Sequence, residues 1–400
     1  MIENLTNIGK KLYDNIFSYF LIFSICIGGY VLPNTSFSLG LFVSFVFSVV
    51  VFLYYIIAKK HVFLFDKGLF LFIFYIFFSQ LVLSIASGEI VIIKRLFIVI
   101  VTSFTIFVFY NLISEESFLK AYEVIGIICS IGLLYQALMV YILKHPVSPI
   151  VILSRVFVPK TNWASNILRP MSFFQEPQAY ATFMLPLLAY TLNHKKYLLS
   201  IFFVICIFLS TSTTGVIMAV GICLYTALII NKHKLSSYIF LIIMIIIFLL
   251  IVRSDIFIYT INKVINISFN NERLSNGFTI LKNLDYKQLI FGVGAGNIYN
   301  IMFNQSIKLP KYYSTFSGII IDYGILGLFL YCFMLYRLFR RQNKIGRLFV
   351  IMIFILSFTQ TILFNTAFVN FYTAYFICSL NEEKNFYKLV FNSHKGGEPS

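Results

Sequence analysis

The sequence predicts an all-α protein embedded in a membrane, and three observations lead to that fold class. Of the 400 residues, 60% are hydrophobic and only 12% are charged, whereas about a quarter of the residues in soluble domains are charged. Apolar runs long enough to cross a bilayer as helices recur from Asn15 to Leu380. None of them shows the apolar–polar alternation of membrane β-barrel strands. A single integral membrane domain over residues 1–400 is therefore expected.

About twelve transmembrane helices are expected, within a range of eleven to thirteen, with ends placed to a few residues. They lie at about 15–32, 37–58, 68–87, 95–113, 121–143, 178–193, 197–211, 214–231, 236–253, 315–336, 347–363 and 364–380, the last two of which also fit one helix and a re-entrant segment. Basic residues gather in the short loops on one side, for example at Lys59–Lys60, Lys195–Lys196 and Arg337–Arg347. Because such loops stay cytoplasmic, both termini are predicted inside, including the tail 381–400. Lys94–Arg95, at an outer edge where long side chains reach the interface, is the exception.

Two segments, 144–177 and 254–314, are much longer than the other loops, and both fall on the outer side. They carry basic residues that include Arg155, Lys160 and Arg273. Cationic outer loops are permitted because the positive-inside bias is weaker for long loops. Such a surface would either hold a lipid-linked phosphate or simply anchor the loop at the interface. The net charge of +16 therefore fits orientation and contact with anionic lipid or phosphate rather than nucleic acid.

The six cysteines fall inside apolar runs at irregular spacing, and no CxxC pair occurs. They are expected to be small buried hydrophobic residues, so neither a disulfide nor a metal site is predicted.

The first long loop ends in a proline-bounded segment from Arg169 to Pro177. Pro170 and Pro177 keep their neighbours extended, so a stiff strut is expected rather than a flexible linker. Pro177 suits the first position of a helix, which makes Glu176 its N-cap, and the helix dipole favours an acid there without any catalysis. Glu176 is thus either a functional acid or a cap, and Arg169 either a functional cation or a contact to lipid headgroups.

A turn rich in serine and threonine, Ser210–Gly215, joins two of the predicted helices. Its hydroxyls are expected to cap backbone N–H groups or to bond across neighbouring helices. A structural role in capping and helix packing is favoured for this turn over a functional one.

The second long loop contains a short amphipathic helix and a glycine turn. Residues 271–281 place Leu274, Phe278 and Leu281 on one face, which would lay the helix on the membrane surface and present Arg273. The run Phe291–Asn297 follows with a GxG pattern, but no βαβ unit surrounds it, so dinucleotide binding is rejected. Its glycines are expected to allow a tight turn or a close backbone approach.

Asp322 lies about two turns into the predicted helix 315–336. A charge at that depth costs a few kcal/mol unless it is paired or hydrated. A partner such as Arg273, or a polar cavity, is therefore expected.

Taken in order, these motifs resemble the O-antigen polymerase and ligase superfamily. The resemblance rests on the strut ending in Glu-Pro, the Ser/Thr turn, an Arg-bearing helix before a GxGxxN turn, and an acid two residues before Gly-x-x-Gly. In this sequence they are Arg169–Pro177, Ser210–Gly215, Arg273 with Gly292–Asn297, and Asp322 with Gly324 and Gly327. The resemblance covers roughly residues 160–330, and its specificity comes from the order and placement of the motifs.

Two positions depart from the superfamily's pattern. Thr213 stands where many relatives carry an arginine, and Tyr313 stands where ligases typically carry a histidine. His145 is the only histidine on the outer side, and it lies far from the motif. The missing histidine favours a polymerase over a ligase and leaves the identity of the base open.

The resemblance implies transfer of a glycan from an undecaprenyl-pyrophosphate donor to a sugar hydroxyl of another lipid-linked repeat unit, at the outer face of the bacterial cytoplasmic membrane. Arg169 and Arg273, with Arg155 as a third candidate, would stabilise the leaving pyrophosphate. Glu176 is the acid best placed to accept the hydroxyl proton. Because arginine can neutralise the phosphates, neither a cofactor nor a metal is expected.

Further contacts to the substrate are expected from residues in or near these motifs: Lys160, Gln178, Gly292, Gly294, Asn297, Tyr312, Tyr313 and Asp322. The two tyrosines would stack on sugar rings or belong to the interfacial aromatic belt. The expected partners are the undecaprenyl-pyrophosphate-linked oligosaccharide, membrane lipid, a chain-length regulator and a flippase.

Two other functions compete with the polymerase. A ligase of the same superfamily would transfer the finished chain to a lipid core or a protein. A transporter or flippase would show matched repeats with broken helices and ionisable residues at mid-bilayer. Here the two halves differ in loop layout, charges cluster at the helix ends, and Pro186 is the only proline well inside a predicted helix.

Overall fold

The computed structural model describes residues 2–35, 37–58, 66–145, 147–158, 169–232, 238–243, 245–246, 272–304, 313–341 and 343–378. Across these ranges every regular element is a helix, apart from one isolated bridge between Val31 and Ser38. The predicted all-α fold class is confirmed.

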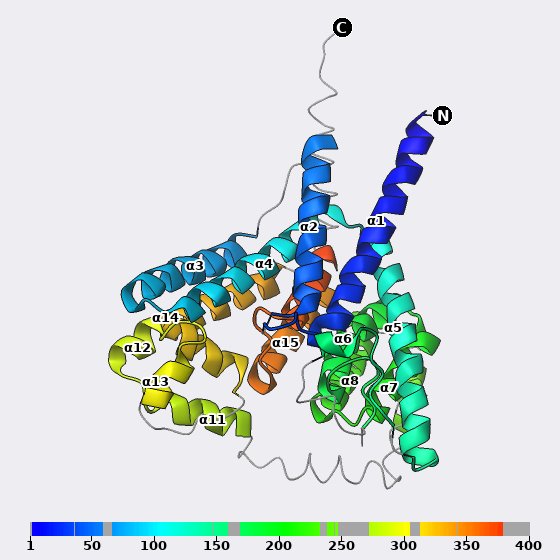
Figure 1. Cartoon of the computed structure of the whole chain (residues 1–400). Coiled ribbons are helices and arrows are strands. Elements are labelled where there is room, and N and C mark those ends of the chain that lie inside the picture. Colours follow the sequence, from blue (N-terminus) through cyan, green and yellow to red (C-terminus); the bar gives the residue numbers. More distant parts are fainter. Residues whose placement is uncertain are drawn as a thin grey trace.

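The chain alternates long helices with short helical turns (Figure 1). The elements up to residue 230 are α1 (Ile2–Cys26), η1 (Ile27–Gly29), α2 (Leu39–Ala58), α3 (Lys67–Ser87), α4 (Ile90–Leu112), α5 (Glu115–Ala137), η2 (Leu138–Ile142), η3 (Arg155–Phe157), α6 (Pro177–Asn193), α7 (Tyr197–Leu209), α8 (Thr213–Tyr225) and η4 (Thr226–Ile230). The later elements are α11 (Glu272–Leu281), α12 (Tyr286–Phe291), α13 (Ile298–Asn304), α14 (Thr315–Arg341), α15 (Lys344–Thr359) and the helix Thr366–Cys378.

Several helices have the length and composition of membrane spans. Within the described ranges, five are long and apolar enough to cross a membrane: Lys67–Ser87, Ile90–Leu112, Glu115–Ile142, Thr213–Ile230 and Thr315–Arg340. Shorter apolar helices accompany them at Asp14–Gly29, Leu39–Tyr54, Tyr197–Leu209 and Thr366–Cys378. Large apolar side chains such as Phe74 and Phe78 are 57% and 60% exposed. An apolar surface of this kind suits lipid better than water.

A helix lies in every predicted membrane segment to within a few residues, although 236–253 is described only at 238–243 and 245–246. The segments 347–363 and 364–380 are two separate helices joined by a non-helical connector at residues 360–365. The second helix, Thr366–Cys378, rises about 20 Å at 1.5 Å per residue, less than the roughly 30 Å hydrocarbon core. The described residues of this helix are therefore too few to cross the hydrocarbon core.

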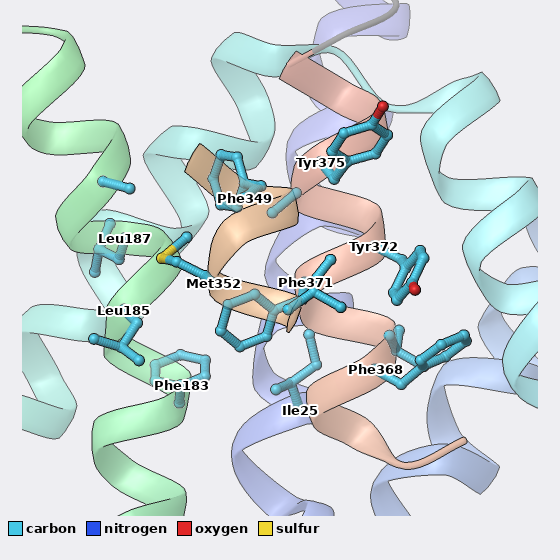
Figure 2. Close-up of a cluster of buried hydrophobic side chains, with 14 of the residues drawn as sticks. Ile25, Phe183, Leu185, Leu187, Phe349, Met352, Phe368, Phe371, Tyr372 and Tyr375 are labelled. Atoms are coloured by element: carbon cyan, nitrogen blue, oxygen red, sulfur yellow. The ribbon is translucent and has the colours of Figure 1, made fainter. Parts of the chain in front are cut away.

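The helix Thr366–Cys378 forms the centre of the apolar core (Figure 2). Its Phe368, Phe371 and Tyr372 are fully buried, and the ring centroids of Phe368 and Tyr372 lie 4.2 Å apart. Ile25 of α1 and Phe183 of α6 lie beside them in the same cluster. Because lipid tails are as apolar as these side chains, close van der Waals packing holds the helices together rather than transfer out of water.

All six cysteines are free thiols, and five of them are buried, as predicted. Cys332 is the exception, because it lies exposed on α14. The exposed neighbours Phe329 and Phe333 show that this face of α14 points away from the core.

The described helices of the second long loop lie far from the start of α1. In Figure 1 the start of α1 lies at one end of the molecule, and α11, α12 and α13 lie at the opposite end. At that end α11 and α12 pack against α14, and Ile298 and Met302 of α13 share a buried cluster with Ile321 of α14.

Candidate functional site

The strut at the end of the first long loop is held against α5. The side-chain oxygen of Gln136 accepts hydrogen bonds from the backbone N–H groups of Met171 and Ser172, at 2.9 and 2.7 Å. The Ser172 hydroxyl donates to the carbonyl of Cys129, and Ser172 itself has a left-handed backbone with φ of 56°. The predicted stiffness thus comes from a buried glutamine on α5 as well as from the two prolines.

Arg169, at the start of the described strut, is bound to the Ser/Thr turn. Its Nε donates to the Thr211 hydroxyl at 2.8 Å, and its Nη2 donates to the Thr211 carbonyl. Thr211 is buried and left-handed, with φ of 53°. A guanidinium has five N–H donors, so three remain for other partners. The strut and the Ser/Thr turn are therefore joined by the contact between Arg169 and Thr211.

The Ser/Thr turn also has the capping role that the sequence predicts. The Ser212 hydroxyl accepts from the Gly215 N–H as the N-cap of α8. Gly215 has no room for a side chain, because an added Cβ would lie 2.4 Å from the Cβ of Ala181 on α6. The turn thereby brings α8 against α6 and holds Thr211 beside Arg169.

Glu176 occupies the N-cap position of α6 with Pro177 at the first helical position, as predicted. Its side chain makes no capping hydrogen bond, and it is exposed. Glu176 therefore caps no backbone N–H of the first turn, although the helix dipole still favours an acid at this position. Glu176 also lines a cavity.

This first cavity has a volume of about 300 Å³ and lies between the end of α1, the start of α6 and the connector 360–365. Its polar lining is made of side-chain amides, hydroxyls and one carboxylate: Gln175, Glu176, Gln178, Thr182, Gln360, Thr361, Asn365, Thr366 and Asn370. Glu176 is the only charged residue among the described residues that line it. Gln178, predicted as a substrate contact, belongs to this lining.

Gly28 and Gly29 let the chain pass close to this cavity at the end of α1. A Cβ added at Gly28 would lie 2.3 Å from the Thr366 hydroxyl, and one at Gly29 would lie 3.0 Å from Gln175. A Cβ at Gly28 would clash with Thr366 at the start of the helix Thr366–Cys378, whereas one at Gly29 would only make a tight contact with the Gln175 side chain. The close approach of η1 to this helix therefore depends mainly on Gly28.

The glycine turn docks against a break in α14. Gly324 has φ of 75° and ψ of −179° inside this helix, a conformation open essentially to glycine alone. The break frees backbone carbonyls, and the turn binds them: Val293 N–H donates to Ile321 (2.8 Å) and Gly294 N–H to Asp322 (3.2 Å). Irregular backbone is tolerated at membrane depth only where such partners exist. The two glycine motifs therefore form one structural unit.

Side chains of α3 complete this unit. Gln80 donates to the Asp322 carbonyl at 3.2 Å and accepts from the Ala295 N–H at 2.6 Å, and the Tyr75 hydroxyl donates to the Tyr323 carbonyl at 2.9 Å. Gly292 has φ of 83°, and a Cβ added there would lie 2.4 Å from the Asp322 carbonyl oxygen. Gly292 and Gly294 thus allow close backbone approach, as predicted.

A second cavity of about 160 Å³ lies beside the break and contains Asp322, Tyr313 and Arg95. The Asp322 carboxyl group lies near the backbone N–H of Gly296 and within reach of the opposite charge of Arg95. The Oδ1 atom of Asp322 is buried and has no partner among the described residues. The polar cavity that the sequence predicts for Asp322 is present, with Arg95 of α4 as the nearby cation.

Tyr313 lies just before α14 and lines the same cavity. The charge of Asp322, followed by burial, raises the pKa of its phenol above the ordinary value. The phenol is therefore protonated at neutral pH and can donate a hydrogen bond into the cavity.

The connector 360–365 joins the two cavities, and Thr361 lines both of them. The Thr361 hydroxyl donates to the Tyr313 carbonyl at 2.7 Å. The Thr315 N–H donates to the Gln360 carbonyl at 2.9 Å, and the Gln360 amide binds the Thr182 hydroxyl at 3.1 Å. Glu176 and Asp322 therefore border adjoining spaces.

Other predicted site residues lie apart from the cavities or outside the described residues. Arg155 is exposed in η3 and lines neither cavity. Lys160 and Tyr312 lie outside the described residues, and Arg273 belongs to α11, where its side chain is likewise outside them. The Asn297 amide donates to the Val293 carbonyl at 3.1 Å, which closes the glycine turn, so its described role is structural.

The apolar face predicted for α11 divides between the outside and the interior of the protein. Phe278 is 63% exposed, as a residue that meets a membrane surface would be, whereas Gly277 and Ile280 are buried. The reason is a close crossing, because a Cβ added at Gly277 would lie 2.4 Å from the Ser317 hydroxyl of α14. A small residue, rather than a large apolar one, fixes which face of α11 packs inward.

Sequence reasoning missed Arg95 and the amides of the last two helices. The sequence indicates only an interface anchor at Arg95, because this side chain gains its position when α4 packs beside the glycine turn. Gln360, Asn365 and Asn370 do carry a signal, since polar residues inside apolar runs mark sites in membrane proteins.

A comparison with protein-family models gives no match for this chain, and a comparison with curated proteins gives none either. Its function therefore has to be inferred from the site itself.

Proposed function

We propose that this chain is a bacterial surface-polysaccharide polymerase that joins undecaprenyl-pyrophosphate-linked oligosaccharide repeat units at the outer face of the cytoplasmic membrane. The observation that carries the proposal is the position of Glu176. This acid stands at an N-cap without capping the helix, and it is the only charge, among the described residues, on a cavity lined by amides and hydroxyls. Such a lining suits a sugar, and the acid suits the removal of a proton from it.

The proposed reaction is a glycosyl transfer. A sugar hydroxyl of the acceptor unit forms a bond to the anomeric carbon of the donor glycan, and the bond between that carbon and the pyrophosphate oxygen breaks. The hydroxyl proton passes to Glu176, and undecaprenyl pyrophosphate leaves with the electron pair of the broken bond. Atoms and charge balance with no redox partner.

The leaving pyrophosphate needs positive charge. Arg169 is fixed by Thr211 with donors to spare, and Arg273 stands on α11, which packs against α14. Fixed guanidinium donors stabilise developing phosphate charge better than mobile lysines do. Arg169 and Arg273 are accordingly proposed to bind the pyrophosphate, one from each long loop, with Arg155 as an additional surface cation.

The proposed topology has about twelve crossings, with both termini cytoplasmic and the two long loops outside. Its support is the distribution of lysine and arginine, together with the position of α11–α13 at the end of the molecule opposite the start of α1. Reporter fusions at residue 144 and at the C-terminal tail should report opposite sides of the membrane. A periplasmic tail would contradict this orientation.

A deletion strain complemented with variants tests the function. Wild-type chain should restore a ladder of glycan lengths, whereas Arg169→Ala and Glu176→Gln should leave single repeat units. A normal ladder with both variants would contradict the assigned roles. Polymer that is made but not attached would identify a ligase, and absence of exported repeat units would identify a transporter.

A further inference from the structure

Asn370 is a buried amide at the wall of the first cavity, on the central helix Thr366–Cys378. Its Nδ2 donates to the Tyr122 hydroxyl at 2.6 Å and points towards the Phe183 carbonyl at 3.5 Å. Its Oδ1 is buried and has no hydrogen-bond partner among the described residues. A buried acceptor of this kind costs free energy unless something binds it.

The cavity around Asn370 has the chemistry of a saccharide site. Five of its lining residues carry side-chain amides: Gln175, Gln178, Gln360, Asn365 and Asn370. Amides and hydroxyls both donate and accept, as sugar hydroxyls and acetamido groups do. The volume of about 300 Å³ lies at the lower limit of small-ligand pockets, so one sugar residue fits better than an oligosaccharide.

The charge of the cavity separates it from a phosphate site. No lysine or arginine is among its described lining residues, and its one charge is the Glu176 carboxylate, which would repel a phosphate. Arg169, the fixed cation of the strut, is bonded to Thr211 and lies outside the lining. The acid needed by an acceptor hydroxyl borders this cavity, whereas the cation needed by the donor does not.

We propose that the first cavity is the acceptor subsite: it binds one neutral sugar residue of the acceptor unit between Asn370 and Glu176. The Asn370 Oδ1 accepts a hydrogen bond from a hydroxyl or acetamido N–H, and Glu176 meets the hydroxyl that reacts. The role of this subsite as the acceptor site rests on the proposed polymerase function. The claim that the cavity binds a sugar does not depend on that function.

Binding is tested with the full chain in lipid nanodiscs, by saturation-transfer difference NMR. The probes are the methyl glycosides of glucose, galactose, N-acetylglucosamine and N-acetylgalactosamine at millimolar concentration. At least one should bind to wild type, and Asn370→Leu should weaken that binding roughly two- to tenfold, as expected for one lost hydrogen bond. Ala179→Leu, which fills the lining of the cavity without altering a polar group, should abolish it.

Two matched controls separate binding from folding. Thr373→Val removes another buried hydroxyl without a described partner on the same helix, away from the cavity lining, and should bind the glycoside like wild type. Tyr122→Phe removes the hydrogen bond to Asn370 Nδ2 but leaves the Asn370 Oδ1 in place. This variant should therefore bind the glycoside more tightly than Asn370→Leu does. Equal binding by wild type, Asn370→Leu and Ala179→Leu would overturn the subsite, as would the absence of binding by any of the four glycosides.

The polymer phenotype distinguishes this inference from the proposed function. If the glycoside binds through Asn370 while a deletion strain keeps its polymer, the saccharide site stands and the polymerase fails. If Arg169→Ala abolishes polymer while Asn370→Leu and Ala179→Leu leave it normal, the polymerase stands and the acceptor subsite fails.

Discussion

Arg169 donates from Nε to the hydroxyl of Thr211 at 2.8 Å and from Nη2 to the carbonyl of the same residue. These residues are separated by α6 and α7, so the pair ties the strut to the Ser/Thr turn. The left-handed backbone of Thr211, with φ of 53°, presents both oxygens to one guanidinium. A side chain held at two points is oriented before substrate arrives, and such preorganisation favours charge stabilisation.

Thr211→Val should lower the rate of polymer formation about tenfold without abolishing it. The hydroxyl bond is lost while the carbonyl bond remains, so Arg169 loses part of its orientation. The measurement is the initial rate with the purified chain in liposomes. Thr214→Val, in the same turn, is the control and should retain the wild-type rate. A wild-type rate for Thr211→Val would show that the pair does not position Arg169.

Glu176→Gln should leave the thermal stability of the protein within about 0.5 kcal/mol of wild type. The carboxylate makes no capping hydrogen bond that the substitution could remove, whereas loss of a true N-cap costs typically about 1 kcal/mol. Thermal unfolding in detergent checks the stability, and the glycan ladder checks the activity. A clear drop in melting temperature with activity retained would make Glu176 a helix cap.

Gly324→Ala should prevent stable folding. The added Cβ would lie 2.0 Å from the Ile290 carbonyl oxygen, and the backbone conformation alone costs about 1–3 kcal/mol for another residue. The yield of monodisperse protein in detergent is the readout. Gly221→Ala is the matched control, because an added Cβ there meets nothing within 4 Å. Equal yields for the two variants would contradict the close docking of the glycine turn on α14.

Arg95 and Asp322 should show coupled effects on stability. Arg95→Ala leaves the buried Asp322 carboxyl without its nearby cation, so it should destabilise the wild type more than the Asp322→Asn background. A coupling of about 0.5–1 kcal/mol is expected, because Arg95 is exposed and partly screened by solvent. A double-mutant cycle of thermal unfolding measures it. Strict additivity would show that the two charges act independently.

The positions of the helices were predictable from the sequence, because apolar runs and polar breaks set them locally. The strut and the N-cap position of Glu176 were also predictable, since Pro170 and Pro177 restrict the backbone wherever the chain goes. The break at Gly324 was not predicted, because it depends on a glycine turn about thirty residues earlier in the chain that supplies hydrogen bonds to the freed carbonyls.

The cavity lining was harder to predict than the catalytic candidates. Glu176 and Gln178 lie in a motif, but Gln360 and Asn370 come from the end of the chain, and only tertiary packing places them beside α6. The packing of α11 was also hard to predict. Its apolar spacing indicates which side carries Phe278, but the side that meets α14 is determined by the small Gly277.

The most direct measurement of the polymerase function uses purified chain in liposomes. The substrate is undecaprenyl-pyrophosphate-linked repeat units extracted from the deletion strain, and the products are separated by gel. The wild-type chain should convert single units into a ladder of lengths, and Glu176→Gln should leave them as single units. Single units that remain unchanged with wild-type chain, or a ladder that forms equally well with Glu176→Gln, would contradict the proposed mechanism.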